Sequence, residues 1–222
     1  VINLNTIGSD DKETGSFHAS ATSDLNISGG TIVLHKPNSA SVPFNDVYII
    51  SGTGKKSISG GGFQIGGANT PERSLFLINS AIPLNNFIIS PDSKPKVSLT
   101  GPLAINNQLS LNGHLLLNGY NLLLGPNAPA ISGKLGAKDG MIVLNNATSG
   151  GEVRKLFNTN GTYLFPVGDN VVVDEYSPLT LDLISGQYSD SAFVGVKVIN
   201  EKSPLISAEK DLIKRCWILR SN

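Results

Sequence analysis

The chain carries little charge. Asp, Glu, Lys and Arg make up 15% of its 222 residues, against about 25% in ordinary globular domains. The 17 basic and 17 acidic residues leave no net charge, and neither half of the chain is strongly basic. Because phosphate binding needs a basic face, the composition argues against a nucleic-acid partner.

The chain also lacks cysteine pairs and long apolar runs. Cys216 is the single cysteine, which excludes an internal disulfide and a cysteine-based zinc site. We expect Cys216 to be a buried, unreactive thiol. Apolar runs such as 115–117 are far too short to span a membrane. The sequence begins at Val1 without a visible signal peptide, so we expect a mature form, a trimmed form or a fragment.

What the chain does have is 24 glycines, many Asn, Ser and Thr residues, and few residues that favour helices. This composition is typical of many short strands joined by tight turns. The most informative stretch is 97–125, VSLTGPLAINNQLSLNGHLLLNGYNLLLG, which contains no acidic or basic residue. An all-β fold is therefore expected.

Apolar residues recur in this stretch at a spacing of six. The first series is Val97, Leu103, Leu109 and Leu115, and the second is Leu99, Ile105, Leu111 and Leu117. The i, i+2 spacing within a unit is that of a strand, and the turns between units are Gly101-Pro102, Asn106-Asn107, Asn112-Gly113 and Asn118-Gly119. One extra residue near Tyr120 shifts the register. Six-residue units of strand plus turn predict a parallel β-helix with about three units in each coil; a run of hairpins is the alternative.

If both series point into one core, the residues between them point outward. We therefore expect Ser98, Ala104, Ser110 and Leu116 to be more exposed than their neighbours, with Leu116 as an apolar exception.

The length and the pattern of the expected strands change near residues 148–151. Further strands are expected before this point at 25–34, 47–52, 58–67, 75–78, 87–90 and 141–146. After it they become longer and alternate, at 153–158, 162–167, 176–184, 192–200 and 212–219. We predict a parallel β-helix over 1–148 and an antiparallel β-sandwich-like domain over 149–222. Five strands are few for a closed sandwich, so this domain is expected to continue beyond Asn222.

Several segments together resemble a known family. The segments are ISGGTIVL, GGGFQIGG and LSLNGHLLLNGYNLLLG, followed by YLFPVGD at 163–169 and YSPLTL at 176–181. Together they look like segments of large secreted cell-surface proteins of the Bacteroidetes phylum. These are adhesin-like cargo of the type IX secretion system. The resemblance implies a right-handed parallel β-helix, export and a place on the bacterial cell surface. It implies no catalytic residues.

Few residues are arranged for catalysis. Parallel β-helices often carry polysaccharide lyases and hydrolases, which need converging carboxylates. The only acidic cluster of the β-helix region is Asp10, Asp11 and Glu13, which reads as a solvated turn. His18 and His35 lie far apart without ligand spacing, as does His114, which follows Asn112-Gly113 and is expected at a solvated turn. No catalytic residue and no cofactor are therefore predicted.

Two weaker signals lie in the C-terminal part. Asp169, Asp174 and Glu175 share one loop and are candidate Ca²⁺ ligands, although an ordinary acidic turn is the simpler interpretation. Asp190-Ser191-Ala192 resembles the short O-glycosylation signal of the same phylum, which makes Ser191 a candidate acceptor.

The favoured function is a non-catalytic structural or adhesive segment of a secreted protein. Its expected partners are neighbouring domains, the secretion machinery and cell-surface glycans. A carbohydrate-binding module is the first alternative, but it would stack sugars on exposed aromatics, and aromatics are only 6% of the chain. A β-helix polysaccharide lyase or hydrolase is the second. Ice binding would need a regular threonine array, which the asparagine-rich turns lack.

Overall fold

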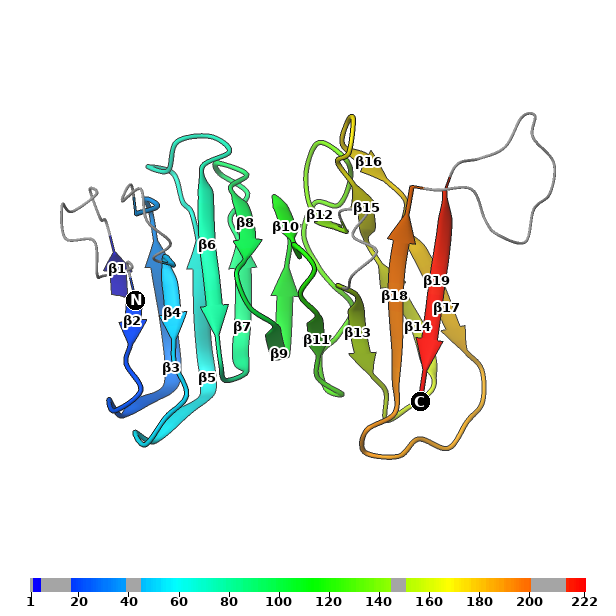
Figure 1. Cartoon of the computed structure of the whole chain (residues 1–222), viewed down its shortest axis with the longest axis horizontal. Helices are drawn as coiled ribbons and strands as arrows, with labels where there is room; N and C mark the ends of the chain where they lie inside the picture. Colours follow the sequence, from blue (N-terminus) through cyan, green and yellow to red (C-terminus); the bar gives the residue numbers. More distant parts are fainter. Residues whose placement is uncertain (1, 5–16, 39–44, 145–150, 201–214) are drawn as a thin grey trace.

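The computed structural model describes residues 2–4, 17–38, 45–144, 151–200 and 215–222. Within these ranges the chain is all-β and contains no helix, as predicted. Accordingly, the described segments include no helix long and apolar enough to cross a membrane. Figure 1 shows the strands lying side by side along the long axis of the molecule, broadly in the order of the sequence.

Two large sheets account for most of the described strands. Sheet A has the order β1 (Ile2–Leu4), β3 (Leu25–Leu34), β5 (Lys56–Ile65), β7 (Leu84–Ile89), β9 (Leu103–Ser110), β11 (Leu122–Leu124), β13 (Val153–Leu156), β18 (Phe193–Ile199) and β19 (Cys216–Ser221). Sheet B has the order β16 (Glu175–Tyr176), β15 (Val167–Asp169), β12 (Met141–Val143), β10 (His114–Leu116), β8 (Lys96–Leu99), β6 (Leu75–Ser80), β4 (Val47–Ile49) and β2 (Phe17–Ala19). A separate pair is formed by β14 (Gly161–Phe165) and β17 (Leu179–Leu183).

The chain alternates between the two sheets, and successive strands of each sheet pair in parallel from β1 to β13 and from β2 to β15. The six-residue repeat sets the length of a coil. Leu115 pairs with Val97, three units earlier. Leu122 pairs with Leu103, one residue further apart, as the shift near Tyr120 requires. Parallel pairing excludes the hairpin alternative for this stretch and gives the chain a solenoid-like fold.

The core consists of columns of apolar side chains, one from each coil. In sheet B the column is Phe76, Val97, Leu115, Ile142 and Val167. In sheet A, Phe63, Phe87 and Leu109 stack in the same way. Every one of these side chains is buried, and burying each stabilises the fold by roughly 1.5–3 kcal/mol. Both six-residue series of the sequence lie in this core, as predicted.

The outward positions agree with expectation. Ala104, Ser110 and Leu116 are half-buried, more exposed than the residues beside them. Ser98 is buried, but at 8% exposed it is still more exposed than Val97 at 0% and Leu99 at 1%. The Asn118 side-chain amide from the next coil covers it and donates a hydrogen bond to its hydroxyl.

One expected turn is also absent. Asn106-Asn107 lies inside β9, which runs without interruption from Leu103 to Ser110. The pairing of β9 with β7 shifts by one residue here, and the Asn107 amide donates to Asn86 Oδ1 of the previous coil at 2.7 Å. A bulge in one long strand therefore replaces the turn.

Beyond residue 150 the strand pairing changes from parallel to antiparallel. β13 and β15 continue sheets A and B in parallel, and antiparallel partners then follow in β16, β18 and β19. The predicted boundary at 148/149 falls outside the described residues. The sandwich-like arrangement of 149–222 stays a prediction.

Lys155 occupies an inward position of sheet A. It pairs with Leu124, which in turn pairs with Ile105, so the lysine stands in an otherwise apolar column and is only 3% exposed. Its ammonium group donates to the carbonyl oxygens of Gly125, Pro126 and Leu156 at 2.7–3.0 Å. Burial lowers the pKa of Lys155 from 10.5 to about 8.

This pKa predicts that stability rises in mild alkali. Between pH 8 and 10.5 the unfolded chain keeps the Lys155 proton while the folded chain loses it, so the free energy of unfolding increases with pH. The expected gain is up to about 3 kcal/mol, since one pKa unit corresponds to about 1.4 kcal/mol. Urea unfolding at pH 7, 8, 9 and 10 measures it. Above pH 10 the buried Tyr163 opposes the rise, because burial raises its pKa and the unfolded chain ionises first.

The variant Lys155→Met should abolish this rise, whereas Lys55→Met, at an exposed position, should preserve it. An equal rise in the Lys155→Met variant would show that another group causes the pH dependence.

Candidate functional site

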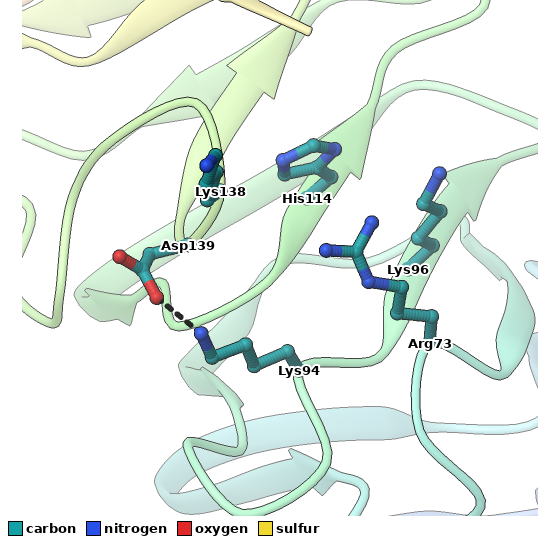
Figure 2. Close-up of a pocket in the computed structure, with 6 residues that line it drawn as sticks. All are labelled: Arg73, Lys94, Lys96, His114, Lys138 and Asp139. Carbon is teal, nitrogen blue, oxygen red and sulfur yellow. Dashed lines mark hydrogen bonds and ion pairs between the residues drawn. The ribbon is translucent and has the colours of Figure 1, made fainter.

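A pocket lined by charged side chains lies at one edge of sheet B (Figure 2). Its lining residues either precede or begin consecutive strands of that sheet. Arg73 precedes β6, Lys94 precedes β8, Lys96 begins β8, His114 begins β10, and Lys138 and Asp139 precede β12. Because β6, β8, β10 and β12 are parallel neighbours, their first residues meet at the same edge.

The turns that carry these side chains stack on one another. Arg73 donates its backbone N–H to Ser93 O at 2.9 Å, and Lys96 donates to Ser74 O at the same distance. Arg73 and Lys94 both adopt a left-handed backbone, with φ of 58° and 44°. The same turn geometry thus places a cationic side chain at the same edge in two successive coils.

Positive charge exceeds negative charge in this pocket. Lys94 Nζ lies 2.5 Å from Asp139 Oδ1, and Lys134 Nζ lies 3.4 Å from its second oxygen. Among the described residues, neither Lys96 nor Lys138 has a carboxylate within ion-pair distance. Within the described ranges, the only carboxylate at ion-pair distance from Arg73 is that of its neighbour Glu72, at 3.9 Å.

His114 forms the buried wall of the pocket and is 5% exposed. The expectation of a solvated turn was wrong, because β10 begins at this residue and the loop before β12 covers it: Nε2 lies 2.9 Å from Ala137 O. A carbonyl oxygen only accepts, so Nε2 carries the proton. Burial lowers the pKa of His114, and the charges of Lys96 and Arg73 act in the same direction, against the Ala137 hydrogen bond and Asp174.

Asp139 is the single carboxylate among the residues that line this pocket. The hydrogen bond from Lys94 lowers the pKa of Asp139, and Lys134 adds to the effect. A carboxyl group held ionised by two lysines is a poor general acid. It serves instead to fix the loop 134–139 against the turn before β8.

A second hollow, of about 370 Å³, lies on another part of the surface. It is lined by Ser80, Ala81, Ile82, Pro83, Pro102, Leu103, Ala104, Asn121, Leu123 and Arg154. The lining is mainly aliphatic and contains neither an acidic nor an aromatic side chain. It therefore offers no proton donor for glycoside cleavage and no ring on which a sugar would stack.

The candidate calcium ligands are divided between two partners. Asp169 and Glu175 are opposite one another in the β15–β16 pair, as their shared loop suggested, but both accept hydrogen bonds from the Arg215 guanidinium. Asp174 instead faces His114, with Oδ1 3.8 Å from Nδ1. No group of three or more His, Cys, Asp or Glu side chains that could hold a metal ion occurs in the described part of the chain.

The other candidate residues do not converge. Ser191 lies in an exposed loop before β18, so its hydroxyl is accessible and its glycosylation stays a prediction. His18 stacks on Tyr48 with ring centroids 5.3 Å apart. Cys216 begins β19 and is half-buried rather than buried. The cluster Asp10, Asp11 and Glu13 lies outside the described residues.

Sequence reasoning missed the cationic pocket, although a signal for it exists. Arg73 lies three residues before Phe76, and Lys94 lies three residues before Val97, and these two apolar residues are partners in adjacent coils. Aligning the chain by its inward residues would have brought the two cations together. The six-residue repeat of 97–125 starts too late to show this alignment.

The fold and the pocket together define the chain as an all-β, solenoid-like protein with a cationic site at one sheet edge. Comparison with protein-family models, with curated proteins and with solved structures gave no match.

Proposed function

We propose that this chain is a non-catalytic structural and adhesive segment of a secreted bacterial cell-surface protein. The observation that carries the proposal is the continuous parallel ladder of sheets A and B around columns of fully buried apolar side chains. Stacked coils of this kind form a stiff, elongated body, in which each coil contacts mainly its neighbours. Such a body is suited to act as a spacer whose exposed sheet faces contact another surface.

The sequence motifs add the setting. Their resemblance to type IX secretion cargo of the Bacteroidetes supports export and attachment at the cell surface. In this proposal the coils wind right-handed and the antiparallel strands after residue 150 belong to a sandwich-like module. Neighbouring domains, the secretion machinery and cell-surface glycans are the partners.

The chemistry of the two hollows favours binding over catalysis. The carboxylate in the cationic pocket is held ionised by lysines, and the larger hollow is lined mainly by aliphatic groups. Retaining and inverting glycosidases both need a second carboxyl group across the scissile bond, one of the two acting as a proton donor.

The purified protein should therefore release no products from polysaccharides. A panel of neutral and acidic plant and bacterial polysaccharides, assayed for reducing ends and for unsaturated sugars, checks this. Product release that disappears when a carboxylate is replaced, for example in Asp139→Asn, would overturn the proposal and indicate a β-helix lyase or hydrolase.

A further inference from the structure

We infer that the cationic pocket on sheet B binds the anionic substituents, carboxylate or sulfate, of an acidic polysaccharide. This inference rests on the proposed adhesive function and names the class of glycan that the surface recognises. It starts from three cations at one sheet edge, Arg73, Lys96 and Lys138 (Figure 2). These cations outnumber the carboxylates within ion-pair distance of them. In a chain with no net charge, this local excess creates a site that attracts anions.

The buried wall of the pocket offers an acceptor beside the cations. His114 is almost fully buried, and its Nδ1 has no hydrogen-bond partner among the described residues. Asp174 approaches this nitrogen only to 3.8 Å. A buried polar atom without a partner is costly. Because Nε2 carries the proton, Nδ1 can only accept, so a water molecule or a ligand hydroxyl can be its partner, whereas a carboxylate or sulfate oxygen cannot.

The size of the pocket limits what can enter it. Its internal volume is about 10 Å³, which is room for about one water-sized group. A whole sugar ring does not fit, whereas an oxygen of a carboxylate or sulfate does. The rest of the ligand must lie outside, across the edge of the sheet, so a charged substituent on a longer chain suits the site.

The arrangement of the cations along the solenoid favours a linear polymer. Three different coils supply these cations: one carries Arg73, a second Lys94 and Lys96, and a third Lys138. Neighbouring coils are about 4.8 Å apart. A polymer that lies along the long axis meets one cationic position after another. A nucleic acid is a poorer fit, because its affinity depends on neutralising many phosphates over a broad basic face, and the cations of this site surround a single small pocket.

Binding to four immobilised probes tests the inference: polygalacturonate for carboxylate, dextran sulfate for sulfate, unmodified dextran as the neutral polymer, and duplex DNA. We expect the protein to bind at least one of the two acidic polysaccharides, to bind dextran much more weakly, and to prefer that polysaccharide over DNA. The double variant Arg73→Gln/Lys96→Gln should lose roughly tenfold or more in affinity, because each cation contributes a charge-assisted hydrogen bond. The matched control Lys55→Gln/Arg220→Gln removes the same charge from exposed positions, one directly before β5 and one within β19, and should change the affinity less than about twofold.

A variant with the opposite effect separates binding from folding. Asp139→Asn removes the carboxylate that competes for Lys94 and Lys134, and it should raise the affinity for the acidic polysaccharide. Equal losses in the two double variants, stronger binding to DNA, or no binding to either acidic polysaccharide would overturn the inference. Product release from the bound polymer would instead overturn the non-catalytic function, while the variant comparison would still report on the site.

Discussion

Replacing Leu111 by Asp should lower the free energy of unfolding by about 4 kcal/mol, among the larger effects of a single substitution. The Leu111 side chain is fully buried in the solenoid core. Its backbone N–H donates to Ser132 O of the next coil at 2.8 Å, so the residue cannot rotate outward without breaking the stack. A carboxylate at this position is buried without a partner. Urea unfolding followed by circular dichroism measures the loss.

The matched control is one residue away. Ser110 faces outward and is half-buried, with Ile88 and Ser132 beside it in the neighbouring coils. Ser110→Asp should change stability by only about 0.5 kcal/mol, as most surface substitutions do. Equal losses at 110 and 111 would contradict the inward and outward assignment of the repeat.

Replacing Arg215 by Met should cost about 3–5 kcal/mol, the usual effect of removing one partner from a buried ion pair. The Arg215 side chain is 13% exposed and contacts Asp169, whose side chain is 1% exposed. It also donates to the Ser177 hydroxyl, and Trp217 Nε1 donates to Ser177 O at 3.0 Å. Arg215 thus links the start of β19 to the β15–β16 pair, and its loss leaves the Asp169 carboxylate buried and unpaired.

A double-mutant cycle separates the ion pair from packing. Adding Asp169→Asn to Arg215→Met should recover part of the loss, because the unpaired charge disappears. Glu175→Gln alone should cost less, since its side chain is 43% exposed and water screens that pair. A loss below about 1 kcal/mol for Arg215→Met would show that this contact contributes little to the folded state.

The core of the solenoid could be predicted because its residues follow a strict local rule. Val97, Leu103, Leu109 and Leu115 recur at a spacing of six, and any strand in a stacked coil must turn such residues inward. The same rule identified the partner of Val97 in the next coil, Leu115. Periodicity of this kind needs no knowledge of distant contacts.

The low exposure of Ser98 and of His114 depends on contacts between coils, which no local pattern contains. Ser98 is covered by Asn118 of the next coil, and His114 by the loop that carries Ala137. The carboxylates Asp169 and Glu175 were correctly placed together, but their partner Arg215 lies about forty residues later in the sequence. A search for metal ligands could not identify a cation supplied by the chain itself.

The cationic pocket was missed for a related reason. Arg73, Lys94 and Lys138 stand in loops of different length, so their common position relative to the strands appears only when the coils are aligned. The overall composition does not reveal this local positive charge, because the chain as a whole is neutral.

The proposed stiff body and the cationic pocket both depend on the stacking of parallel coils. Disulfide trapping reports on this stacking, in a Cys216→Ser background that removes the native thiol. Ser98 pairs with Leu116 in parallel strands of sheet B, at a separation of about 4.8 Å, which a disulfide can bridge. A run of hairpins would instead place Ser98 opposite Ala104, in the next six-residue unit. Ser98→Cys/Leu116→Cys should form an internal disulfide on mild oxidation, and Ser98→Cys/Ala104→Cys should not; the reverse result would show that consecutive units pair as hairpins.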